Sequence, residues 1–352
     1  MKIIVSILFI ISIICISCLT KNDSQSGENN RFVSPLSKDE LKKLSESKQK
    51  FAFLRMHAPD EKRIAMDYGF GDIFVYNLPD STLYRLTDDN DFEDNLCWSP
   101  DGTKILFASS RDHFDWHIHD NSQAMAVTNL FYIDLNTGLI NQIYFLNTEI
   151  SVAKFNGLTW TKSGIYFSDY DNKIYRLNEY GDSLSIFLDT HEECKITEIS
   201  FSQNGKYLAF GASPFDFNEE FKIGLYDIAN KELKWILRKS SSFLLSGWNN
   251  ENTSFFFTRK DTLVQYNILN GIESPFKLLG STNKLRIAYC FYISNEEVVY
   301  ISSDNPYKDY SGKIREAKWG VAIGIENIIT RQLRYPIYDN HVKDDLAVYY
   351  SR

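Results

Sequence analysis

Short apolar runs separated by turn residues recur along most of the chain. In residues 96–110 (LCWSPDGTKILFASS) and 199–213 (ISFSQNGKYLAFGAS), a strand-like run leads into an Asx-Gly pair and then into a second, alternating run. Asx-Gly pairs supply the positive backbone angles of a tight hairpin, and alternation of apolar with polar or small residues is typical of half-buried strands. Weaker copies lie at 158–170, 246–260 and 290–304. The pattern therefore predicts a series of related hairpins.

Third and fourth strand-like runs complete each unit. The third runs span 72–78, 129–135, 173–179, 222–228, 262–268 and 320–326, and the fourth span 82–87, 139–145, 184–188, 233–237, 274–279 and 331–337. Phe, Trp and Tyr together make up 15% of the chain, and these residues favour strands. Because a fixed period of several tens of residues marks a repeat architecture, we expect six units of four strands.

The repeat resembles that of TolB-type β-propellers, which have WD40-like repeats of the form W-S-P-D-G-x-x-I-x-F followed by D-I-Y-x-x-D. Residues 98–102 (WSPDG) match this form closely, and residues 201–205 (FSQNG) match it less well. The resemblance covers residues 50–352 and implies an all-β fold, a six-bladed β-propeller of four-stranded blades. We assign residues 46–352 to this domain.

The ends of the repeat region suggest how the ring closes. The first unit enters at residues 50–56 (KFAFLRM) without the strand and turn that precede this position elsewhere, and residues 345–350 (DLAVYY) form a spare apolar strand at the C-terminus. Radial closure leaves only short, protected sheet edges. We therefore expect the C-terminal strand to complete the first blade.

The N-terminus has the pattern of an export signal. Lys2 is followed by a mostly apolar run over residues 3–16, too short to span a bilayer, and then by Ser17 and Cys18. This resembles a bacterial lipoprotein signal, in which residues 1–17 are removed and Cys18 carries the lipid. Cys15 stands where that family usually has an aliphatic residue, and an ordinary secretory signal is the alternative. Residues 18–45 are expected to hold the lipidated cysteine and a flexible, polar tether.

The resemblance implies a protein of the bacterial cell envelope that is attached to the membrane through acyl chains such as palmitate on Cys18; we expect the outer membrane. The formal net charge of −8, without a basic block, disfavours nucleic acid as a partner. Cys97, Cys194 and Cys290 are odd in number and far apart, so a disulfide framework is not expected. Burial is the default expectation for Cys97 and Cys290. We expect a monomer.

Three histidines lie in an insertion of the second unit that runs from about residue 111 to 128. His113, His117 and His119 would approach one divalent metal ion if this loop folded back on itself. No short zinc signature accompanies them, and exposed histidines bonded to local carbonyls are the alternative. Apart from the covalent lipid and this metal, no cofactor is expected.

Two insertions join second strands to third strands and therefore open on one face. They span residues 111–128 in the second unit and 305–319 in the sixth. Their aromatic and charged residues fit a recognition surface, and local packing of the loops is the alternative. The residues expected on this binding face are Phe114, Trp116, Tyr307, Tyr310 and Trp319.

Catalytic signatures do not occur in the sequence. There is no G-x-S-x-G elbow, no P-loop and no G-x-G-x-x-G after a strand, so no catalytic residue is assigned. We therefore favour a membrane-anchored binding or scaffold module for a protein or glycan partner over an enzyme. The alternative is an envelope enzyme of carbohydrate or peptide metabolism that uses a metal held by the histidines of the second unit.

Overall fold

The computed structural model describes residues 32–56, 71–88, 93–109, 129–143, 156–169, 171–215, 220–239, 243–259, 262–278, 286–303, 307–308, 314–315 and 320–350. Over these ranges the regular secondary structure is β-strand apart from one α-helix, α2 (Lys38–Glu46), which precedes the first long strand. No helix within the described ranges is long and apolar enough to cross a membrane.

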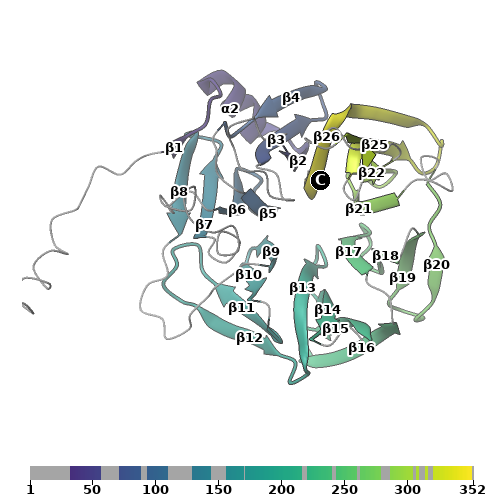
Figure 1. Ribbon diagram of the computed structural model, residues 1–352. Helices are drawn as coiled ribbons and strands as arrows, with labels where there is room; N and C mark the ends of the chain where they lie inside the picture. The colour runs from purple at the N-terminus through teal and green to yellow at the C-terminus, as the bar shows by residue number, and fades with distance from the viewer. Residues whose placement is uncertain are drawn as a thin grey trace, which may run out of the picture. The chain divides into compact units, whose positions relative to one another are not determined.

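Six antiparallel blades of four strands form a ring (Figure 1), which confirms the all-β, six-bladed propeller. Blade 1 contains the second half of β26 (Leu333–Tyr350), β2 (Gln49–Met56), β3 (Gly71–Asn77) and β4 (Thr82–Arg85). Blade 2 contains β5 (Glu93–Trp98), β6 (Lys104–Ser109), β7 (Asn129–Asp134) and β8 (Leu139–Ile143), and β1 (Phe32–Val33) extends its sheet at β8. Blade 3 contains β9 (Asn156–Thr161), β10 (Gly164–Ser168), β11 (Lys173–Leu177) and β12 (Ser185–Asp189).

The remaining blades follow the same order. Blade 4 contains β13 (Cys194–Phe201), β14 (Tyr207–Pro214), β15 (Phe221–Asp227) and β16 (Glu232–Lys239). Blade 5 contains β17 (Phe243–Trp248), β18 (Ser254–Arg259), β19 (Thr262–Asn267) and β20 (Glu273–Pro275). Blade 6 contains β21 (Arg286–Tyr292), β22 (Glu297–Ser303), β25 (Gly320–Asn327) and the first half of β26, and β23 (Tyr307–Lys308) pairs separately with β24 (Ile314–Arg315).

The ring closes through the C-terminal strand, as the sequence predicted. Strand β26 pairs with β25 of blade 6 at its start, where Ile337 faces Ile323, and with β2 of blade 1 at its end, where Val348 faces Phe51. Leu346, Phe51 and the two isoleucines belong to one buried cluster. One continuous strand therefore fastens the last blade to the first.

The two ends of the ring differ in their connections. We call the end that carries the turns between strands 1 and 2 and between strands 3 and 4 of each blade the hairpin face. The opposite end, with the connections between strands 2 and 3 and between blades, is the loop face. At the hairpin face Gly102 and Gly205 adopt φ angles of 70° and 67°, which confirms the two predicted Asx-Gly turns.

Inner strands of neighbouring blades are tied together by side chains. The Trp98 indole donates to the backbone oxygen of Ala347 (3.1 Å), linking blade 2 to blade 1, and the Trp248 indole donates to Ser200 (3.0 Å), linking blade 5 to blade 4. Buried hydrogen bonds of this kind are costly to break, because the separated groups lose their partners without gaining water. The scaffold behind the loops is therefore rigid.

The hydrophobic core lies between adjacent blades and within them. Phe210 of β14 packs on Gly224 of β15, where an added Cβ atom would lie 2.2 Å from the phenylalanine ring. Cys97, Cys194 and Cys290 are buried free thiols, which confirms the burial expected for Cys97 and Cys290. Burial raises the pKa of each of these three thiols, so they remain protonated and unreactive.

Helix α2 was not predicted, because it falls in the segment assigned to the tether. Ser37 and Glu40 form a capping box: the Ser37 backbone N–H donates to the Glu40 carboxylate (2.8 Å), and the Glu40 N–H donates to the Ser37 hydroxyl (3.4 Å). Leu41 and Leu44 are buried on one side of the helix. In the part of the chain that the structure describes, these two leucines and an ion pair between Lys43 and Asp80 hold the helix on the propeller.

A buried lysine joins helix α2 to the ring. The Lys50 ammonium donates to the backbone oxygen of Leu44 at the end of the helix and lies 4.9 Å from the centre of the Trp98 ring. Burial lowers the pKa of Lys50 to about 8, and the negative charge of Asp101 partly opposes this shift. Lys50 and Trp98 therefore couple the helix to the seam between blades 1 and 2.

Candidate functional site on the loop face

The site residues expected from the sequence fall outside the part of the chain whose side chains the structure describes. Tyr307 opens strand β23, but only its backbone is described. The others lie outside the described residues: Cys18, His113, Phe114, Trp116, His117, His119, Tyr310 and Trp319. The lipid, metal and binding-face assignments for them stay predictions.

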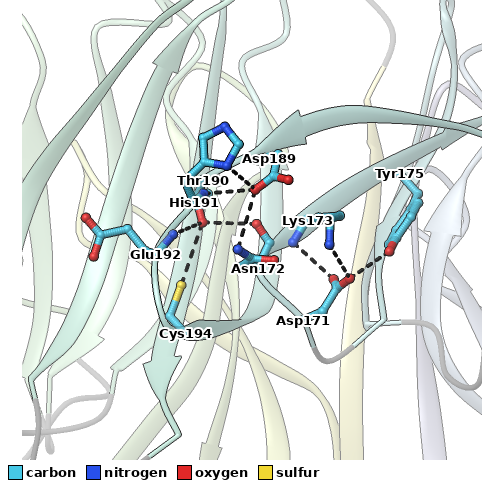
Figure 2. A network of polar contacts seen from close by, with 9 residues as sticks. All are labelled: Asp171, Asn172, Lys173, Tyr175, Asp189, Thr190, His191, Glu192 and Cys194. Carbon is cyan, nitrogen blue, oxygen red and sulfur yellow. Dashed lines mark hydrogen bonds and ion pairs between the residues drawn. The ribbon is translucent and has the colours of Figure 1, made fainter.

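The described part of the loop face includes a polar network where blade 3 meets blade 4 (Figure 2). It is built from two short connections, residues 171–172 before β11 and residues 190–193 between β12 and β13. We call this network the blade 3 cluster. Its residues are Asp171, Asn172, Asp189, Thr190, His191, Glu192 and, from blade 4, Lys222.

Backbone hydrogen bonds hold the two connections together. The Thr190 N–H and hydroxyl both donate to the backbone oxygen of Asn172, at 3.1 and 3.0 Å. The Ile196 N–H of the next blade donates to the Asp171 oxygen at 2.9 Å. The side chains of the cluster therefore project from a fixed frame shared by two blades.

His191 is the most exposed member of the cluster. Its backbone has a φ of 54°, which is uncommon for a residue with a side chain, and 85% of the side chain is exposed. The Asp189 carboxylate accepts the His191 backbone N–H (2.9 Å) and lies 3.2 Å from ring atom Nδ1 (Figure 2). With Nδ1 held by Asp189, Nε2 is the ring atom available to a ligand.

Asp171 orders the other side of the cluster. Its carboxylate accepts the Lys173 backbone N–H (3.0 Å) and the Tyr175 hydroxyl (2.6 Å), and the Lys173 ammonium lies 3.8 Å away. Burial and this hydrogen bond both raise the pKa of Tyr175, so the tyrosine stays protonated and acts as a donor. The Asp171 carboxylate is therefore held in place by fixed neighbours.

An ion pair connects the cluster to blade 4. The Lys222 ammonium at the start of β15 donates to the Glu192 carboxylate at 2.6 Å and lies 5.4 Å from the centre of the Trp235 ring. Lys222 is largely buried, whereas a third of the Glu192 side chain is exposed. The ion pair thus fixes a carboxylate at the surface between two blades.

The chemistry of the cluster suits hydrogen bonding. A histidine held by a carboxylate is also part of many catalytic triads, but those need a nucleophile beside the imidazole. Here the Thr190 hydroxyl donates to Asn172, and the nearby Cys194 thiol is buried. Among the described residues, no group of three His, Cys, Asp or Glu side chains is placed to hold a metal ion.

Sequence reasoning did not single out this cluster. Within it, Glu192 is paired with Lys222, whereas the neighbouring Glu193 is exposed. The available signal was the position of two polar runs, SDYDN (168–172) and DTHEE (189–193), at the same face of one predicted unit. Each run by itself is typical of an ordinary turn.

Comparisons with known proteins agree on the fold. No family model matches the sequence, and no curated protein matches it. A solved structure assigned as a TolB from Agrobacterium tumefaciens aligns over 86% of this chain and 97% of its own, with a TM-score of 0.57 and 10% identity. At that identity the likeness concerns the fold alone, and at this level the resemblance to TolB-type propellers is confirmed.

Two oligogalacturonate lyase structures are also similar. One, in complex with manganese, aligns over 82% of this chain and 74% of its own, with a TM-score of 0.49 and 12% identity. The other, from Vibrio parahaemolyticus, aligns over 82% and 73%, with a TM-score of 0.46 and 12% identity. A fold by itself does not decide between binding and catalysis.

Proposed function

We propose that the protein is a binding propeller of the bacterial cell envelope that presents its loop face to a protein or glycan partner. The observation that carries this proposal is His191, an exposed side chain whose ring and backbone N–H are both held by the Asp189 carboxylate. Binding residues are often loop residues that a rigid scaffold holds in position.

Rigidity of the scaffold supports a binding role. The loops of the blade 3 cluster are short, bonded to each other and joined to blade 4 through Lys222. A preordered surface loses little conformational entropy when it binds, so more of its contact energy appears as affinity. The imidazole and carboxylates of the cluster suit a partner rich in hydroxyl or amide groups, such as a glycan or a peptide backbone.

Attachment to the membrane is part of the proposal. Lipid on Cys18 would hold the protein at the bilayer, because each buried methylene contributes about 0.8 kcal/mol and two or more chains give stable attachment. The propeller would then act as a monomeric, membrane-held receptor or scaffold.

A pull-down with two matched variants tests the binding role. His191→Gly removes the exposed imidazole at a positive φ of 54°, and Lys231→Gly removes an exposed side chain at a φ of 56° on the hairpin face. Glycine suits both positions, so both variants should fold. We expect His191→Gly to weaken partner capture from detergent-solubilised envelopes about tenfold, equivalent to one lost hydrogen bond, and Lys231→Gly to leave it unchanged.

Equal capture by both variants would contradict the proposed role of the loop face. Metal bound in stoichiometric amount, and lost when His113 and His117 are replaced by alanine, would instead favour the alternative of a metal-assisted envelope enzyme. Metal analysis of the purified chain therefore separates the two functions before any substrate is known.

A further inference from the structure

Large aliphatic side chains stand exposed on the turns between strands 3 and 4. Leu269 and Ile272 in blade 5 are 74% and 57% exposed, and Ile329 in the same turn of blade 6 is 67% exposed. Further exposed apolar residues lie at the hairpin-face ends of blades 1, 2 and 3. We call the whole set the apolar rim: Val33, Leu83, Tyr180, Leu269, Ile272 and Ile329.

The turns themselves do not require these side chains. In blade 5 the Asn267 carboxamide oxygen accepts the Leu269 N–H (2.9 Å), and in blade 6 that of Asn327 accepts the Ile329 N–H (3.0 Å). Blade 2 builds the same turn with polar Asn136, whose N–H bonds to the carboxylate of the strand-ending aspartate at 2.8 Å. Because an asparagine serves equally well at this position, leucine and isoleucine there call for another explanation.

The chain leaves the propeller at the same face. The Ser34 N–H donates to the oxygen of Gly138 (2.8 Å), which lies in the strand 3–4 turn of blade 2. Residues 19–33 separate Ser34 from Cys18, and even a fully extended chain of that length reaches only about 55 Å. A lipid on Cys18 would therefore tether the propeller from its hairpin face.

We propose that the hairpin face rests on the lipid surface through the apolar rim, so that the loop face points away from the membrane. This inference rests on the proposed lipid anchor and adds an orientation to it. Burial of apolar side chains at the boundary between headgroups and acyl chains lowers the free energy of the bound protein. The net charge of −8 gives no electrostatic attraction to anionic lipid, so the contact is apolar and should persist in high salt.

Fluorescence quenching by lipid tests this orientation. The full chain is purified from membranes and placed in phosphatidylcholine and phosphatidylethanolamine vesicles that contain a nitroxide-labelled lipid. A fluorophore is attached to a cysteine introduced at Leu269, at Ile329 or, as the control, at Phe215, which is 54% exposed and follows β14 at the loop face. Native Cys97, Cys194 and Cys290 are buried and should not react.

We expect the labels at positions 269 and 329 to lose about half of their fluorescence, in low and in high salt, and the label at 215 to lose none. With a label at Leu83, the double change Leu269→Ser and Ile329→Ser should reduce quenching. Unquenched rim labels, or equal quenching at 215, would overturn the orientation. Protection of the rim labels by a co-purifying protein instead of by lipid would also overturn it.

Vesicle flotation separates this outcome from a failure of the anchor. If the chain floats with the vesicles but the rim labels are not quenched, the anchor is present and the proposed orientation is wrong. A chain that floats no better than Cys18→Ala contradicts the anchor. In that case a hexahistidine inserted after Leu19 attaches the chain to vesicles that contain a nickel-chelating lipid, and the fluorescence of the labels is measured again. Quenching at positions 269 and 329 then supports contact of the apolar rim with lipid. The absence of quenching there overturns this contact.

Discussion

Glu198 illustrates how single residues adapt the inner strands of the ring. Its carboxylate lies against Gly211 of the neighbouring strand, where an added Cβ atom would come within 2.3 Å of Oε2, and the Thr197 hydroxyl donates to it. The side chain is half-buried in strand β13. Burial raises the pKa of Glu198 from 4.5 to about 7, although the Thr197 hydrogen bond works against this. Glu198 therefore titrates near neutral pH.

Replacing Glu198 should change how stability depends on pH. Between about pH 4.5 and 7 the unfolded chain has released this proton and the folded chain keeps it, so stability falls as pH rises through this window. We expect Glu198→Gln to match the wild type at pH 5 and to exceed it at pH 8.5 by up to about 3 kcal/mol in urea denaturation. The exposed control Glu193→Gln should change stability by less than about 0.5 kcal/mol at both pH values. If Glu198→Gln changed the free energy of unfolding equally at the two pH values, the Glu198 carboxyl would not be desolvated.

At the scale of elements, a residue with positive φ recurs in the strand 3–4 turn of all six blades, and the blade 2 turn also packs against helix α2. The fourth position of each strand 3–4 turn has a positive φ: Ser81, Gly138, Gly181, Lys231, Gly271 and Arg331. At Gly138 an added Cβ atom would meet Leu41 Cδ1 of helix α2 at 2.7 Å, whereas at Gly271 it would meet only the Tyr266 hydroxyl at 3.6 Å. The blade 2 turn therefore also forms the surface on which helix α2 packs.

Two alanine substitutions measure how much the packing of helix α2 on the blade 2 turn contributes to stability. Gly271→Ala should cost about 1 kcal/mol for its positive φ alone, and Gly138→Ala should cost about 1 to 3 kcal/mol more, because it also crowds Leu41. Urea denaturation gives both values. In the background of Leu41→Ala the extra cost at Gly138 should shrink. Equal costs for the two glycines would mean that α2 does not pack on this turn in solution.

The sequence predicted repeated elements better than isolated ones. The third run of the second unit, 129–135, is found as β7 at 129–134, because alternation and flanking turns recur in every unit. Helix α2 was missed, since a capping box and two leucines are a weak signal among polar residues. The blade 3 cluster was missed because Asp189 and Asp171 become neighbours only after the blade has folded.

At the scale of the whole molecule, the propeller is a rigid ring with two different ends. The loop face carries the blade 3 cluster with His191, and the hairpin face carries the apolar rim and the exit of the chain toward Cys18. An anchored propeller in this orientation would offer its loop face to partners in the aqueous space. The central claim is that specific binding occurs there.

Photo-crosslinking in intact envelopes tests this claim most directly. A photoreactive amino acid is placed at His191 on the loop face or at Lys231 on the hairpin face, both exposed turn positions with positive φ. We expect one discrete crosslinked product, with a protein or a glycan, from position 191 and no such product from position 231. A discrete product from position 231 only, with none from 191, would contradict it.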